Sequence, residues 1–148
     1  MQGEIASDCA PLNGLCEAIL GTGAEVRVLR DPTRGGVATT LNEFIEGTTL
    51  GIELHEDKIP VRDQVRAACD MLGLDPLYCA NEGKLLAVVA ADDAERVLSS
   101  MRETEEGRNA AIIGRVSAGY PGKLVMDTAF GGKRILQKLT GAQLPRIC

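Results

Sequence analysis

The sequence predicts an α+β fold in which a mixed sheet is backed by helices. Two observations lead to this prediction. Amphipathic segments, with apolar residues spaced three or four apart, alternate along the chain with short strand-like segments, and no internal repeat links them. The 148 residues, 45% of them hydrophobic, are enough for one domain. A chain of this length buries roughly two-thirds of the surface that its unfolded form exposes.

The first half of the chain is expected to contain three helices and two strands. In order, they are a helix at 8–21, a strand at 24–29, a turn at 31–36, a helix at 35–46, a strand at 50–54 and a helix at 61–72. Each helix shows an apolar stripe at helical spacing. In the last of them, the side chains expected to face inward are Val65, Ala68, Cys69 and Leu72.

The second half is expected to contain the central strand. Residues 85–91 form a continuous apolar run, which is typical of a strand covered on both faces. Asp92 and Asp93 are placed to cap a helix that continues to about Arg102. The last strands are expected at 110–116 and 123–126, and 129–134 is interpreted as a glycine turn between two strands.

From about Leu139 onward no periodicity remains, and Gly141 and Pro145 interrupt the segment. We therefore expect a folded domain at 1–138 and a mobile tail at 139–148. Fully extended, ten residues span at most ~35 Å, which is enough to reach a neighbouring subunit or a partner.

Composition excludes several classes of function. Aromatic residues make up 3% of the chain, Trp is absent and the net charge is −5, so a nucleic-acid partner is not expected. No apolar run is long enough to span a membrane, and the N-terminus lacks the features of a secretion signal. The single histidine, His55, is expected at the surface, and no metal site is predicted.

The cysteines indicate a reduced, cytoplasmic protein. Their number, five, is odd, and none forms a CxxC pair, so neither a zinc site nor a disulfide framework is expected. Four of them lie in apolar patterns and are interpreted as buried, unreactive thiols: Cys9, Cys16, Cys69 and Cys79.

The turn at 31–36 is a candidate phosphate site. Gly35 and Gly36 allow the backbone to approach a ligand closely, and the N–H groups at the start of the next helix point toward any anion. Arg34 adds a fixed positive charge. The alternative is that Asp31 or Thr33 merely caps the helix, and the two interpretations have similar weight.

Two further candidates are a carboxylate and a thiol. Glu82, in the Asn81-Glu82-Gly83 stretch, precedes the apolar strand, where partial burial would raise its pKa and suit it to proton transfer. The alternative, an ordinary loop glutamate, is favoured by the local sequence. Cys148 ends the sequence, and a thiol with no chain after it can be carried into another active site. The alternative is that the final cysteine is accidental.

Three stretches taken together resemble the C-terminal half of the HypE family, which belongs to the AIR-synthase-related (PurM-like) superfamily. They are Asp31-Pro32-Thr33-Arg34-Gly35-Gly36-Val37-Ala38, Ala80-Asn81-Glu82-Gly83-Lys84 and Pro145-Arg146-Ile147-Cys148. The first stretch is shared by the superfamily, whereas the last is specific to HypE.

The resemblance implies an activity in the maturation of NiFe hydrogenases. In the family, HypF carbamoylates the terminal cysteine, HypE dehydrates the product to a thiocyanate with ATP, and the cyanide passes to iron on a HypC–HypD complex. The resemblance assigns Cys148 as the carrier, Glu82 as the base and Asn81 as a weaker neighbour. Asp31, Thr33, Arg34, Gly35 and Gly36 would lie on the phosphate side.

The resemblance also implies that ATP, with Mg²⁺, is bound mostly by an N-terminal domain that this sequence lacks, and that the full-length protein is a homodimer. The domain alone is therefore expected to be inactive. Two alternatives remain: half of another PurM-like ATP-dependent synthase or kinase, and a non-enzymatic module that docks partners through its tail.

Overall fold

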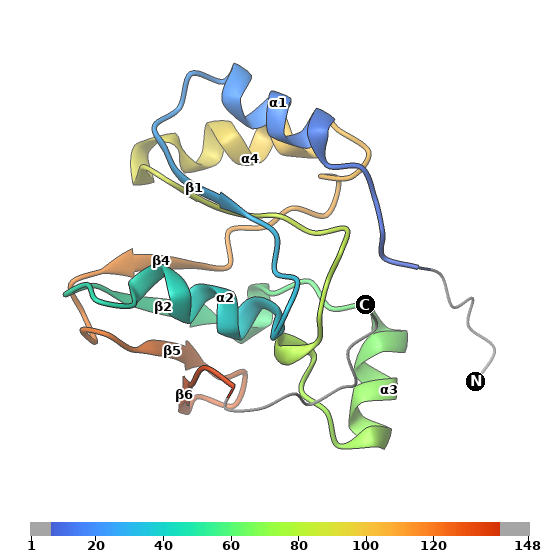
Figure 1. Ribbon diagram of the computed structural model, residues 1–148, viewed down its shortest axis with the longest axis vertical. Coiled ribbons are helices and arrows are strands. Elements are labelled where there is room, and N and C mark those ends of the chain that lie inside the picture. Colours follow the sequence, from blue (N-terminus) through green and yellow to red (C-terminus); the bar gives the residue numbers. More distant parts are fainter. Residues whose placement is uncertain (1–6, 140–148) are drawn as a thin grey trace. The chain divides into compact units, whose positions relative to one another are not determined.

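The computed structural model describes residues 7–139, which form two compact units. The larger unit contains residues 32–80 and 113–139, and the smaller unit contains 7–31 and 81–112. The chain therefore passes from one unit to the other three times (Figure 1). Among the described residues, no helix is both long enough and apolar enough to cross a membrane.

A four-stranded mixed sheet forms the centre of the larger unit. Its strands, in spatial order, are β4 (Gly114–Ser117), β2 (Gly51–His55), β5 (Leu124–Asp127) and β6 (Lys133–Leu136). β2 pairs antiparallel with β4 and parallel with β5, and β5 and β6 form an antiparallel hairpin. The predicted mixed sheet is confirmed, and so is the glycine turn, which joins β5 to β6.

One face of this sheet forms the core with helix α2 (Gly36–Ile45), which lies over the sheet in Figure 1. Because side chains alternate along a strand, every second residue points toward α2. These residues are buried: Ile52, Leu54, Leu124, Met126 and Leu136. From α2, Ala38, Leu41 and Ile45 complete the layer.

Helix α3 (Asp63–Leu72) differs from the prediction in what it buries. Of the four residues expected to face inward, only Cys69 is buried, whereas Ala68 is exposed and Val65 and Leu72 are 42% and 71% exposed. The reason is that α2 already covers the core face of the sheet. α3 packs instead against the short 3-10 helix η2 (Pro76–Tyr78), and η2 covers only a narrow strip of the surface of α3.

The smaller unit packs two helices against a two-stranded sheet. Helices α1 (Asn13–Gly21) and α4 (Ala94–Arg102) contact each other, and strands β1 (Val26–Arg30) and β3 (Leu86–Val89) pair antiparallel. The buried centre of the unit consists of Leu15, Ile19 and Val97.

For this unit, one prediction is wrong and another is confirmed only in part. β3 is not a central strand covered on both faces, because within residues 7–139 it pairs with β1 alone, and its four residues are only partly buried. Asp93 occupies the predicted N-cap position of α4, but its side chain makes no capping hydrogen bond. Its carboxylate instead accepts a hydrogen bond from the backbone N–H of Glu25 at 2.8 Å and pairs with Arg96.

The start of the first helix also differs. α1 begins at Asn13 instead of residue 8, because Pro11 has no N–H and restricts the residue before it. Cys9 therefore lies outside the helix and is exposed, so its predicted burial is wrong. Cys16 and Cys79 are partly buried, and Cys69 is buried as predicted.

Candidate functional site

The Gly35–Gly36 turn requires glycine at both positions. Gly35 has φ 72° and Gly36 has φ 63°, a conformation that other residues rarely adopt. A Cβ on Gly36 would lie 2.5 Å from the carbonyl oxygens of both Leu77 and Cys79. The turn is thus pressed against the backbone of η2, and this contact fixes where α2 begins.

The start of α2 carries features that suit an anion. The first N–H groups of a helix have no partner within the helix and favour negative charge. Thr39, one turn into α2, is 8% exposed, and its Oγ1 is buried without a hydrogen-bond partner among the described residues. This hydroxyl lies directly against Gly35, since a Cβ on Gly35 would be 2.3 Å from it. Thr39 was not singled out from the sequence, although Gly-Gly followed three residues later by Thr is the signal that marks it.

The helix-capping alternative for Asp31 and Thr33 is wrong. The residue at the N-cap of α2 is Gly35, which has no side chain to bond to the helix start. Asp31 belongs to the smaller unit, where it pairs with Arg30 at 3.5 Å. Thr33 is partly buried and Arg34 is exposed.

The Glu82 loop lies in the smaller unit, where Asp8 holds it. The backbone N–H of Glu82 donates to Asp8 Oδ2 at 3.0 Å, and Lys84 pairs with the same oxygen at 3.7 Å. A Cβ on Gly83 would lie 1.6 Å from the carbonyl oxygen of Asp8, so only glycine fits there. Glu82 itself is exposed, which agrees with the ordinary loop glutamate that the local sequence favours. Asn81 is partly buried.

The segment 75–79 contacts both the Gly35–Gly36 turn and the C-terminal strand of the larger unit. Its carbonyls contact Gly36, as described above, and Asp75 pairs with Arg134 of β6. Tyr78 Oη donates to the carbonyl oxygen of Gln137 at 2.9 Å, which ties the end of the described chain to η2. Two residues after Cys79 the chain reaches Asn81, in the other unit.

The thiol of Cys79 is not a reactive group. Burial, with Cys69 beside it, raises the pKa of Cys79 to about 11. At neutral pH almost none of it is therefore thiolate, the form that reacts. Cys148, the predicted carrier, lies outside the described residues.

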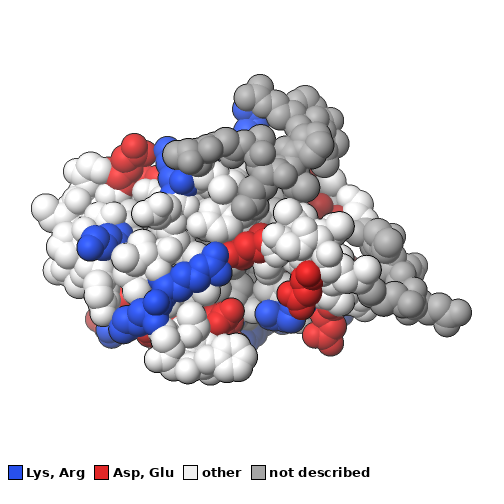
Figure 2. Space-filling model, turned by 90° about the horizontal axis from the view of Figure 1, so that it is seen from below, with Lys and Arg blue, Asp and Glu red and all other residues white. Residues whose placement is uncertain are grey.

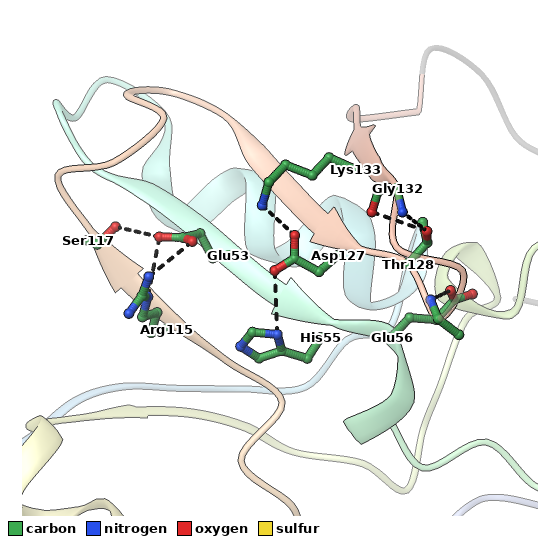
Figure 3. Close-up of polar contacts among 10 residues, drawn as sticks. Glu53, His55, Glu56, Arg115, Ser117, Asp127, Thr128, Gly132 and Lys133 are labelled. Carbon is green, nitrogen blue, oxygen red and sulfur yellow. Dashed lines mark hydrogen bonds and ion pairs between the residues drawn. The ribbon is translucent and has the colours of Figure 1, made fainter.

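A polar network covers the face of the sheet opposite α2 (Figure 3). Arg115 and Ser117 bond to Glu53, and Asp127 pairs with His55 at 3.6 Å and with Lys133. The guanidinium of Arg115 lowers the pKa of Glu53, and the hydrogen bond from Lys133 lowers the pKa of Asp127. Every charge in the network faces an opposite one, so we assign it a role in strand pairing and not in catalysis. His55 is partly exposed, close to the predicted surface position.

The network holds no metal site. No group of three or more metal-ligating side chains exists within residues 7–139. On the face shown in Figure 2, acidic and basic side chains lie side by side. This mixture differs from the continuous basic surface that phosphate backbones attract.

Comparison with known proteins places these features in a family. Residues 3–127 match the model of the AIR synthase related protein, C-terminal domain. A protein of Azotobacter vinelandii called carbamoyl dehydratase HypE is 53% identical over 147 residues, which are 99% of this chain and 43% of that protein. The chain thus spans less than half the length of this relative.

Solved structures agree with the family match. A structure of HypE in complex with ATP superposes with a TM-score of 0.89 at 46% identity, covering 98% of this chain and 44% of that one. The structure of a HypE–HypF complex gives a TM-score of 0.86 at 43% identity, covering 93% of this chain and 44% of that one. The chain therefore belongs to the family of AIR synthase related C-terminal domains, and it is similar over nearly its whole length to the C-terminal part of HypE.

Proposed function

We propose that this chain serves the ATP-dependent dehydration of an S-carbamoylated cysteine to a thiocyanate, which supplies cyanide for the metal centre of NiFe hydrogenase. The observation that carries the proposal is the similarity of almost the entire chain to proteins named carbamoyl dehydratase. The chain spans 43% of the first of these relatives, so the remaining parts of the active site would belong to an N-terminal ATP-binding domain. The chain of 148 residues would therefore be inactive without that domain.

In the proposed reaction, Cys148 carries the carbamoyl group as a thioester-like S–C(=O)–NH₂. Transfer of the γ-phosphoryl group of ATP to the carbonyl oxygen makes that oxygen a good leaving group. Loss of both N–H protons and of phosphate then leaves S–C≡N, so the products are thiocyanate, ADP and phosphate. Glu82 is the proposed base, because an exposed loop carboxylate can reach a group that another segment brings to it. Asn81 is a weaker candidate for orienting the amide.

The phosphate side of the site is proposed at the start of α2. The first N–H groups of α2 favour a phosphate oxygen, and the hydroxyl of Thr39, which has no hydrogen-bond partner among the described residues, lies beside Gly35. Arg34, which is exposed, adds the positive charge, and Thr33 lies beside it. Asp31 is acidic and would face a phosphate only through Mg²⁺. Since residues 7–139 hold no group of three metal-ligating side chains, the rest of the Mg²⁺ ligands would come from ATP and from outside these residues.

The proposed partners follow the same similarity. HypF would load Cys148, as supported by the existence of a HypE–HypF complex among similar structures. A HypC–HypD complex would receive the cyanide, and the full-length protein would form a homodimer. We propose a cytoplasmic location, which is consistent with the absence of a disulfide bond among residues 7–139.

The test compares Cys148→Ala with Cys9→Ala in the complete natural protein, incubated with HypF, a carbamoyl donor and ATP. Cys9 is the matched control because it is an exposed thiol of the same domain. Mass spectrometry should find the carbamoyl group, and then the loss of about 18 Da as one water leaves, in the Cys9→Ala protein and not in the Cys148→Ala protein. Loading and dehydration in the Cys148→Ala protein would refute the proposal.

A further inference from the structure

The proposed base, Glu82, lies two residues from a lysine that pairs with a different acid. Among residues 7–139, the carboxylate of Glu82 has no hydrogen-bond or ion-pair partner. The ammonium of Lys84 lies instead 3.7 Å from Oδ2 of Asp8. Opposite charges attract at short range, so either carboxylate could hold this lysine. The position of Asp8 decides between them.

Asp8 is fixed against the loop by contacts that do not involve the lysine. The backbone N–H of Glu82 donates to Asp8 Oδ2 at 3.0 Å, so the oxygen that pairs with Lys84 lies beside the backbone of the base. A Cβ on Gly83 would lie 1.6 Å from the carbonyl oxygen of Asp8 and 3.0 Å from the backbone nitrogen of Ala10. All of these residues belong to the smaller unit. The negative charge of Asp8 is therefore held next to the loop.

The ion pair between Lys84 and Asp8 is loose. Its 3.7 Å exceeds the length of a hydrogen bond, and the two side chains are 49% and 41% exposed. Exposed pairs of this kind contribute little to stability. Since the Glu82 N–H and Lys84 Nζ contact the same oxygen, the ammonium also lies within reach of the Glu82 side chain. Without the charge on Asp8, the carboxylate left in this loop would be that of Glu82.

We propose that Asp8 is a positioning residue for the dehydration, because its charge holds Lys84 away from the carboxylate of Glu82. The inference rests on the proposed function, in which Glu82 takes a proton from the carbamoyl nitrogen. A carboxylate accepts a proton through the lone pairs of its oxygens, and an ammonium bound to those oxygens occupies them. Asp8 thus keeps the base free, while its hydrogen bond to the Glu82 N–H keeps the loop in place.

The test separates the charge of Asp8 from its hydrogen bond, in the complete natural protein. Asp8→Asn keeps an oxygen that can accept the Glu82 N–H and removes the charge. It should lower the dehydration rate about fivefold, since an exposed ion pair shifts an equilibrium by at most about that factor. Adding Lys84→Met removes the amine that would occupy Glu82. The double variant should therefore dehydrate at the rate of Lys84→Met alone, within about twofold.

The matched control adds Arg108→Met, in place of Lys84→Met, to Asp8→Asn. Arg108 is an exposed basic residue of the same unit, so its removal should restore nothing. An unchanged rate in Asp8→Asn would overturn the proposal, because Asp8 would then act only through its hydrogen bond. A double variant that stays about fivefold slower than Lys84→Met would overturn it too. So would the loss of dehydration in Lys84→Met alone, since the lysine would then serve the reaction directly.

A second readout needs neither ATP nor HypF. A carbodiimide joins a carboxylate to an amine in contact with it, with loss of one water, and peptide mass spectrometry identifies the pair. The native protein should link Lys84 to Asp8, and the Asp8→Asn protein should link Lys84 to Glu82. Absence of the Glu82 link in Asp8→Asn would refute the proposal even if dehydration slowed. If the link moves to Glu82 while a Glu82→Gln protein dehydrates normally, the proposed function is wrong and the hold of Asp8 on Lys84 stands.

Discussion

Replacing Gly36 by alanine should destabilise the protein by an amount that the structure sets. Two effects add together. The positive φ of 63° is strained for any residue with a Cβ, which costs about 1 kcal/mol. The new Cβ would also lie 2.5 Å from two carbonyl oxygens, those of Leu77 and Cys79. Backbone must then shift, as in an overpacked core, at a cost of about 1–3 kcal/mol. The total is about 2–4 kcal/mol.

Gly47 offers a matched control. Its φ is 72°, close to that of Gly36, but a Cβ there would meet nothing within 4 Å. Gly47→Ala should therefore cost only the conformational term of about 1 kcal/mol. Urea denaturation followed by circular dichroism measures both variants, and the difference between them isolates the contact between the turn and η2. If the two alanine variants lose the same stability, Gly36 does not pack against residues 77–79 as described.

Three further predictions concern the polar network, the thiols and the Glu82 loop. Arg115 and Lys133 hold the pKa values of the Glu53 and Asp127 carboxyl groups below their ordinary values. The stability that these two ion pairs contribute is therefore present above about pH 4, and it is lost as the pH falls through the pKa values of the folded protein. Acid titration of the unfolding midpoint should therefore be less steep in Glu53→Gln, and an unchanged slope would count against the network. In thiol labelling at pH 7.5, Cys9 should react before Cys69 and Cys79, as read by peptide mass spectrometry, and early labelling of Cys79 would contradict its raised pKa. Asp8→Ala removes the contacts that hold Glu82 and Lys84. It should lower the dehydration rate about tenfold with little loss of stability. The control is Asp92→Ala, which changes an exposed acid of the same unit and should leave the rate unchanged.

Local patterns in the sequence were enough to locate most elements. The apolar spacing before Ile45 predicted α2, and the consecutive glycines predicted the turn in front of it. Contacts between distant segments were not predictable. Asp8 meets the Glu82 loop across 74 residues, and Gly36 meets residues 77–79 across about forty. A single sequence does not show which segment, distant along the chain, packs its backbone against a given glycine.

The errors have the same origin. The apolar residues of α3 and of 85–91 were interpreted as facing a core, which is the usual reason for such a pattern. Within the part of the chain that the structure describes, α3 contacts mainly η2 and β3 pairs with β1 alone, so much of this apolar surface stays exposed or half-buried. Periodicity shows that a face is apolar, but it does not show how much other structure is available to cover it.

The proposed chemistry depends most directly on Glu82 acting on a group carried by Cys148. The decisive measurement is the mass of the peptide that ends at Cys148 in the complete Glu82→Gln protein, after incubation with HypF, a carbamoyl donor and ATP. Glu103→Gln, which changes an exposed acid of the same unit, is the control. We predict that both variants gain the carbamoyl group and that only the control then loses water. Loss of water at the normal rate in Glu82→Gln would contradict the account.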